Sequence, residues 1–155
     1  MKGGTVLKLN NKGVTLIEIV VALAISVIIL ATAAGILLTS YNFFKNIAQS
    51  NEDKLIGDTI YTLVSDKITL ANEVEIINEQ NLILDNENTI EVNDGKLFYN
   101  GEDIFGGNFN NGQSVSMNIT QYSSNSVSVY VYVWQDGRQT YNTGSVIKLL
   151  NYEFS

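Results

Sequence analysis

The sequence predicts an α+β fold in which one long N-terminal helix packs against a C-terminal antiparallel sheet. Three observations predict this fold: an apolar run without charge from Ile19 to Leu38, helical spacing of apolar residues to about Asn72, and apolar–polar alternation from Glu73 onward. The chain has 155 residues and neither proline nor cysteine. This length suits one modest domain plus an anchor or tail.

The apolar run is long enough to cross a membrane. At ~1.5 Å per helical residue it extends ~30 Å, which is the hydrocarbon thickness of a bilayer. Lysines precede the run, whereas Glu52 and Asp53 follow it. The positive-inside rule therefore predicts a single pass through the cytoplasmic membrane, with the N-terminus inside.

A single carboxylate, Glu18, lies at the start of this run. A charge at the centre of a membrane helix costs ~2.5–3.5 kcal/mol on insertion scales, so Glu18 requires a partner. Gly13 indicates where that partner comes from. If the chain is cut after Gly13, Val14 gains an α-ammonium group one helical turn from Glu18.

In this segment the sequence resembles the type IV pilins and pseudopilins. The family pattern is a short basic leader, a glycine, a usually aromatic first mature residue, Thr-Leu-x-Glu, and an unbroken apolar helix. Two features depart from it, because a valine replaces the aromatic residue and no proline bends the helix. The matching residues here are Gly13, Val14, Thr15, Leu16, Ile17 and Glu18.

The resemblance implies a filament subunit that a prepilin peptidase processes. The enzyme would remove residues 1–13, and in the family it also methylates the new terminus, here Val14. Residues 14–40 would form the transmembrane and filament-core half of the helix. Residues 41–155 would form the soluble domain, in which the helix continues to about residue 72.

Each motif residue then has an expected role. Glu18 would set the assembly register by pairing with the Val14 ammonium of its own or the adjacent subunit. Thr15, Leu16 and Ile17 would serve recognition and packing around the cut. The implied partners are other pilin or pseudopilin subunits, the prepilin peptidase, the assembly platform and the cytoplasmic membrane. The mature form would lie in an extracellular or cell-surface filament.

Two other interpretations of the N-terminus compete. A secretory signal peptide would be cut at Ala31-Thr32-Ala33, but it would place Glu18 in its apolar region and leave apolar residues beyond the cut up to Leu38. A plain single-pass anchor leaves Glu18 without a role. The precursor cut after Gly13 explains leader, glycine, glutamate and helix together.

The helix is predicted to continue beyond the membrane with one apolar face. Gln49 to Lys54 is polar on all sides and predicts a solvated neck. The apolar positions recur mostly at steps of three and four, as on one face of an amphipathic helix. They are Phe44, Ile47, Ala48, Leu55, Ile56, Ile60, Leu63, Val64, Ile68 and Ala71.

The C-terminal half is predicted to form a single antiparallel meander. Asn93-Asp94-Gly95, Asn100-Gly101 and Asp136-Gly137 supply hairpin turns. The expected strands are Val74–Ile77, Leu82–Leu84, Thr89–Val92, Lys96–Tyr99, Ser114–Ile119, Ser126–Gln135 and Val146–Tyr152.

The strand from Ser126 has the clearest alternation. Its valines at 127, 129, 131 and 133 should pack on the helix. Tyr130, Tyr132 and Trp134 fall on the other face, where an aromatic row offers a surface for a glycan or a partner. The alternative is that loops or a neighbouring subunit cover them.

Composition excludes several functions. Without His and Cys there are no thiolate or imidazole metal ligands, disulfides, or His- or Cys-based catalytic sets. The formal charge is −7, and loss of the leader leaves six basic against sixteen acidic residues, which disfavours general nucleic-acid binding. The acidic stretches Asp85–Asn88 and Glu102-Asp103 offer oxygen ligands for a cation, but neither matches an EF-hand loop, so solvated turns are expected there. We therefore expect no enzyme activity, cofactor or metal, and the calcium site of some pseudopilins is not expected because Glu153 is the only acid from Tyr141 onward.

The sequence thus predicts a structural subunit of a type IV pilus or of a type II secretion or competence filament. The irregular sheet and the missing disulfide favour a minor pilin or pseudopilin. The alternative is a membrane-anchored or secreted binding module that uses the aromatic row.

Overall fold

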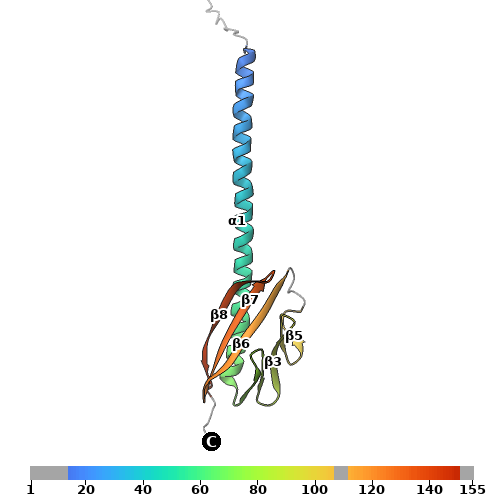
Figure 1. Cartoon of the computed structure of the whole chain (residues 1–155), viewed down its shortest axis with the longest axis vertical. Helices are drawn as coiled ribbons and strands as arrows, with labels where there is room; N and C mark the ends of the chain where they lie inside the picture. Colours follow the sequence, from blue (N-terminus) through green and yellow to red (C-terminus); the bar gives the residue numbers. More distant parts are fainter. Residues whose placement is uncertain (1–13, 107–111, 151–155) are drawn as a thin grey trace, which may run out of the picture. The chain divides into compact units, whose positions relative to one another are not determined.

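The computed structural model describes residues 14–106 and 112–150, so the predicted leader lies outside the described residues. One helix, α1 (Leu16–Leu70), precedes eight strands, which confirms the α+β class (Figure 1). The strands are β1 (Val74–Asn78), β2 (Asn81–Leu84), β3 (Asn88–Asn93), β4 (Lys96–Tyr99), β5 (Glu102–Asp103), β6 (Gln113–Ser123), β7 (Ser126–Gln135) and β8 (Arg138–Lys148).

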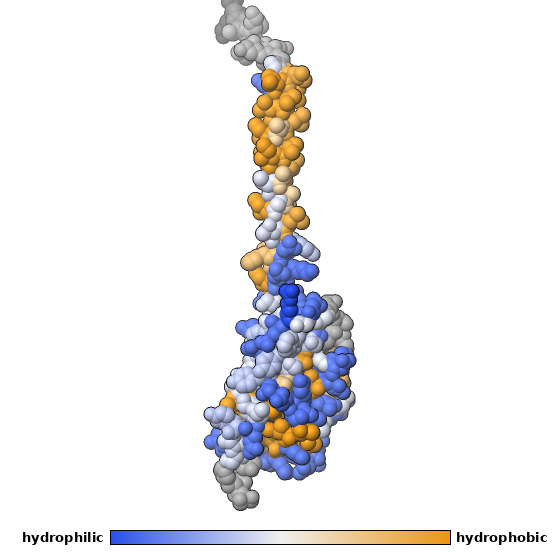
Figure 2. Space-filling model, in the orientation of Figure 1, coloured by the Kyte–Doolittle hydropathy of each residue, from blue (hydrophilic) through white to orange (hydrophobic). Residues whose placement is uncertain are grey.

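The chain divides into two compact units, Met1–Lys45 and Asn46–Ser155, and α1 contributes residues to both. In the first unit, every described residue up to Thr39 is exposed, and Figure 2 shows these side chains as mostly apolar. Within the described chain, α1 is the one helix with the length and apolar composition to cross a membrane, with a mean hydropathy of 2.8 in its most apolar stretch.

The serine and threonine hydroxyl groups in this apolar stretch donate hydrogen bonds to backbone carbonyls three or four residues earlier in the helix. Ser26 Oγ donates to the carbonyl of Ala22 at 2.8 Å, and Thr39 Oγ1 donates to the carbonyl of Gly35 at 2.9 Å. Thr32 Oγ1 likewise donates to a carbonyl one turn earlier. These polar groups therefore need no water, which suits a helix surrounded by lipid or by other apolar helices.

In the second unit, one face of α1 is buried in a core with both sheets. Ile60, Val64 and Ile68 are fully buried, which confirms the centre of the predicted apolar face. The prediction was wrong at Phe44, Ile47 and Leu55, whose side chains are 68%, 41% and 67% exposed. Gly57, instead, lies on the buried face, because its missing Cβ makes room for the ring of Tyr141.

The predicted solvated neck was also wrong in part. Asp53 is only 1% exposed, and its Oδ1 accepts a hydrogen bond from Gln113 Nε2 at 2.8 Å. Residue 53 lies one helical turn before Gly57, so it continues the buried face by a further turn. Because Asp53 is charged, the spacing of apolar residues in the sequence does not reveal that the buried face extends this far.

The strands form two sheets, not the single meander that the sequence predicted. Their orders are β1-β2-β3-β4-β5 and β6-β7-β8, and every neighbouring pair is antiparallel. The amide of Val115 donates to the carbonyl of Gly95, and the amide of Ile119 to that of Glu79, at 2.8 and 2.9 Å. The two sheets therefore meet at separate hydrogen bonds without a continuous ladder.

The hairpin turns are confirmed. Asp94-Gly95, Asn100-Gly101 and Asp136-Gly137 all have positive φ at both residues, as the two-residue turns of tight hairpins require.

The last strand was predicted at the wrong place. The structure forms β8 at Arg138–Lys148, immediately after the Asp136-Gly137 turn, whereas the sequence predicted Val146–Tyr152. β8 is the edge strand of its sheet, so polar residues are tolerated along it and its alternation is weak. Residues 151 and 152 of the predicted strand lie outside the described residues. The two-residue strand β5 was not predicted at all.

Candidate assembly and processing site

The start of α1 is closed by reciprocal hydrogen bonds between Thr15 and Glu18. Glu18 Oε2 accepts a bond from the Thr15 amide at 2.8 Å and one from the Thr15 hydroxyl at 2.9 Å. The Glu18 amide donates to Thr15 Oγ1 at 3.4 Å. This arrangement is a capping box, in which Thr at the N-cap and Glu three residues later satisfy each other's amides.

In the capping box, the Glu18 carboxylate already accepts two hydrogen bonds, from the amide and the hydroxyl of Thr15, within a single chain. The signal was present in the sequence, because Thr-x-x-Glu ahead of an apolar run is typical of a helix start. Sequence reasoning instead assigned Thr15 to recognition and packing. The structure adds a second task, which is to hold the Glu18 carboxylate beside the first turn.

One oxygen of that carboxylate is not used. Oε1 of Glu18 makes no hydrogen bond to another described residue. The neighbouring motif side chains are open: Val14 is 71% exposed, Leu16 80% and Ile17 71%. Gly13, the predicted cleavage residue, lies outside the described residues. The site thus presents an unpaired carboxylate oxygen and three exposed apolar side chains at one helix end.

The aromatic residues of β7 lie apart in sequence from this motif, on the second unit. Their strand buries its valines at 127, 129, 131 and 133 and turns Tyr130, Tyr132 and Trp134 to the opposite face, as predicted. Tyr130 is 42% exposed, and the other two side chains are partly buried. Trp134 Nε1 donates to Ser116 Oγ at 2.9 Å, which fixes the indole ring.

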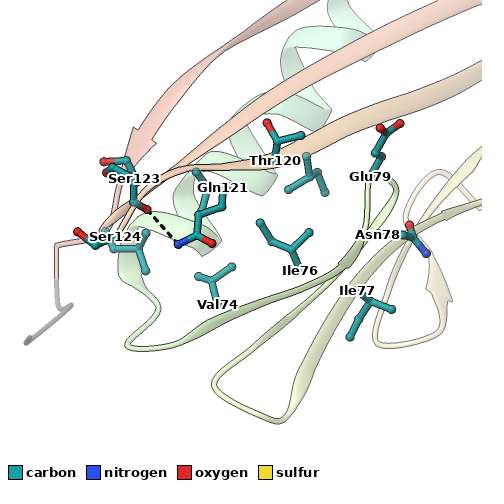
Figure 3. A pocket seen from close by; sticks show the side chains of 13 residues that line it. Val74, Ile76, Ile77, Asn78, Glu79, Thr120, Gln121, Ser123 and Ser124 are labelled. Atoms are coloured by element: carbon teal, nitrogen blue, oxygen red, sulfur yellow. Dashed lines mark hydrogen bonds between the residues drawn. The ribbon is translucent and has the colours of Figure 1, made fainter. Parts of the chain in front are cut away.

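A groove of ≈ 500 Å³ lies between β1 and the β6–β7 hairpin (Figure 3). Val74 and Ile76 of β1 line one side, whereas Thr120 and Gln121 of β6 line the other. Glu79 is the one charged residue that lines it among the described residues. The other polar residues that line it are serine, threonine, asparagine and glutamine.

The acidic turns use their carboxylates within the fold. Asp85 Oδ1 accepts the amides of Asn72 and Glu73 at 2.8 and 3.0 Å, where the chain leaves α1. Within residues 14–106 and 112–150, acidic side chains form no cluster of three or more that would hold a metal ion.

Asp103 has a perturbed carboxyl group. Burial raises the pKa of Asp103, but hydrogen bonds from the Phe105 amide, the Lys96 ammonium and the Gly106 amide outweigh it, and the pKa falls below its ordinary value. The Lys96 Nζ to Asp103 Oδ2 distance is 3.3 Å. The group therefore stays ionised and accepts hydrogen bonds from Lys96 of β4 and from the amides that follow β5.

Comparison with known families identifies the N-terminal region. The prokaryotic N-terminal methylation motif matches residues 8–34, which include the capping box and the first part of the apolar helix. Searches of curated proteins and of solved structures give no match.

The motif supports the resemblance to the type IV pilins and pseudopilins, and the fold is pilin-like: a long N-terminal apolar helix that packs against antiparallel sheets. It implies processing by a prepilin peptidase and assembly into filaments with other pilin subunits. Together with the exposed apolar helix, it indicates membrane anchoring and a place on a pilus surface.

Proposed function

We propose that this protein is a minor pilin or pseudopilin of a type IV pilus or of a type II secretion or competence filament. The observation that carries the proposal is the methylation motif on a helix whose first part is apolar and exposed on all sides. An apolar helix surface of this length is stable in a bilayer or in a bundle of like helices, but not in water. The family is structural, so no catalytic set is required.

Cleavage after Gly13 frees the Val14 ammonium beside Glu18. The Thr15 bonds occupy Oε2, so the ammonium of the same or an adjacent subunit pairs with Oε1. An ion pair in an apolar bundle has a strict geometry, because an unpaired charge there is costly. This pair therefore fixes the axial register of an otherwise uniform apolar helix.

Orientation follows from charge. Lys2, Lys8 and Lys12 keep the leader in the cytoplasm, where the prepilin peptidase acts, and the second unit lies outside. The mature chain leaves the cytoplasmic membrane through the assembly platform.

The test is the mass of the mature chain, after co-expression with a prepilin peptidase and again without it. We expect an amino terminus at Val14, with or without a methyl group, only when the peptidase is present. A terminus at Ala34 would indicate a signal peptide. Assembled filaments whose subunits still begin at Met1 would contradict the proposal that this protein is a processed filament subunit.

A further inference from the structure

The outer face of the β6–β7–β8 sheet differs in charge from the rest of the protein. From Gln113 to Gln135 the sequence has no charged residue, and β8 has charges only at its first and last residues, Arg138 and Lys148. The chain as a whole carries sixteen acidic residues. In Figure 2 much of this side of the second unit is pale, which marks residues of intermediate hydropathy, and more hydrophilic, blue regions lie beside it.

We call this surface the neutral face and define it by the strand register. Each of its residues lies opposite the next across the strands, and all point away from the valines that cover the helix. They are Ser114, Ser116, Asn118 and Thr120 of β6, Ser128, Tyr130, Tyr132 and Trp134 of β7, and Asn142, Gly144 and Val146 of β8. Lys148 lies opposite Ser126 and bounds the face at one end.

Two of the three aromatic rings of the neutral face have a position that the sheet sets, by a hydrogen bond for Trp134 and by space beside Gly144 for Tyr130. Trp134 is fixed by its bond to Ser116. Tyr130 lies opposite Gly144, where a Cβ would meet the Tyr130 ring at 2.6 Å and the Val129 carbonyl oxygen even more closely. Gly144 therefore lets the ring lie across the neighbouring strand. Fixed rings lose little conformational entropy when a ligand stacks on them.

The polar groups between the rings have unused hydrogen-bonding capacity. The hydroxyl groups of Tyr130 and Tyr132 make no hydrogen bond to another described residue. The same holds for the side-chain amides of Asn118 and Asn142, which lie opposite these tyrosines on either side. The face thus alternates ring surfaces with donors and acceptors that carry no charge.

We propose that the neutral face binds a neutral oligosaccharide. The ring faces of tyrosine and tryptophan are electron-rich and attract the polarised C–H groups of a sugar ring. The phenol and amide groups match a ligand that presents many hydroxyl groups. An anionic ligand would gain no ion pair at the centre of the face. This role goes beyond filament assembly and does not depend on it.

The chain offers a reporter for this surface, because Trp134 is its only tryptophan. The test is the emission of the full-length protein in dodecylphosphocholine micelles, which contain no sugar headgroup. Cellohexaose, chitohexaose and maltohexaose are titrated separately. We expect at least one to shift the Trp134 emission in a saturable way, with an affinity that added sodium chloride leaves unchanged.

Two variants locate the binding. Tyr132→Ser, at the centre of the face, should weaken the affinity about tenfold through loss of one stacking ring. Tyr122→Ser is the matched control, because Tyr122 is 70% exposed and lies near the end of β6. If Tyr132→Ser does not fold, Asn142→Ala removes an exposed amide at the same position and should also weaken binding.

Three outcomes would overturn the proposal. The first is no emission change with any of the three oligosaccharides. The second is equal weakening by Tyr122→Ser and by the variants of the face, which would place binding elsewhere. The third is a change of emission on dilution of the protein without sugar, because it would show that a second copy of the chain covers the face.

Discussion

At the residue scale, Glu18 has two roles that a substitution can separate: it caps the start of α1, and its negative charge is proposed to pair with the Val14 ammonium. Glutamine also closes a capping box, so Glu18→Gln keeps the helix start and removes only the charge. We expect cleavage after Gly13 to persist, because the scissile bond lies a full turn away. Incorporation into filaments should fall strongly, since the Val14 ammonium then has no carboxylate in an apolar bundle.

The measurement for Glu18→Gln combines the mass of the mature chain with an immunoblot of sheared filaments. Glu52→Gln is the control, because Glu52 is an exposed glutamate on the same helix. Undiminished incorporation of Glu18→Gln would show that Glu18 is not the assembly residue.

Tyr141 gives a prediction about pH. Its hydroxyl donates to Asp58 Oδ1 at 2.7 Å, and this bond, burial and the nearby negative charge together raise the pKa of Tyr141 above 10.0. A pKa raised by folding means that the stabilisation is full below the pKa of the unfolded chain. It is lost as pH rises through the higher pKa of the folded chain.

Tyr141→Phe should therefore destabilise the second unit by about 1 kcal/mol at neutral pH, through loss of one hydrogen bond. The difference from the wild type should shrink in alkaline solution. Thermal unfolding across pH measures it, with Tyr122→Phe as the exposed control. A difference that stays constant to high pH would contradict the assigned cause.

At the scale of elements, Gly57 shows how α1 fits against β7 and β8. A Cβ at Gly57 would lie 2.6 Å from Tyr141 Cδ1 and 3.2 Å from Val133 Cγ2. Gly57→Ala gains ~1 kcal/mol of helix propensity, but overpacking costs ~1–3 kcal/mol. Since the Tyr141 ring is also held by Asp58, we expect a net loss of stability.

Thermal unfolding of Gly57→Ala in micelles tests this balance. Gly35→Ala is the matched control, because Gly35 lies on the same helix with no atom within 4 Å of the position of its Cβ. It should leave the unfolding temperature of the second unit unchanged. A higher unfolding temperature for Gly57→Ala would mean that the ring of Tyr141 moves at little cost.

The elements also show what could be predicted from the sequence. The helix, the hairpin turns and the valine face of β7 follow from local periodicity and turn chemistry, so they were predicted closely. Asp53 was missed because its burial depends on Gln113, which lies 60 residues further along the chain. The way the two sheets meet likewise depends on contacts such as the hydrogen bond from Ile119 to Glu79, which no local pattern contains.

At the scale of the whole molecule, the second unit contains a core that does not use the apolar first part of α1. The buried side chains of α1 in this core begin at Ile60, and the other members come from the strands and the loops between them. We therefore expect a fragment from Lys45 to Ser155 to fold without the anchor. Reductant should not affect it, because the chain has no cysteine.

Circular dichroism and thermal unfolding of this fragment, with and without reductant, provide the measurement. A fragment that begins at Gly57 is the control, because it lacks Asp53 and the bond to Gln113 and should unfold at a lower temperature. A disordered spectrum for the longer fragment would show that the soluble unit needs the preceding helix.

Within each sheet, every strand pairs with the strand next to it in sequence, and this affects the order in which the chain folds. In both sheets each hairpin closes over a short loop, so the pairing of strands within a sheet does not wait for a distant segment. If the second unit is translocated from α1 towards its C-terminus, β1 to β5 emerge and pair while β6 to β8 are still being translocated. The first sheet then offers a surface on which the second sheet closes, so exposed strand edges persist only briefly during export.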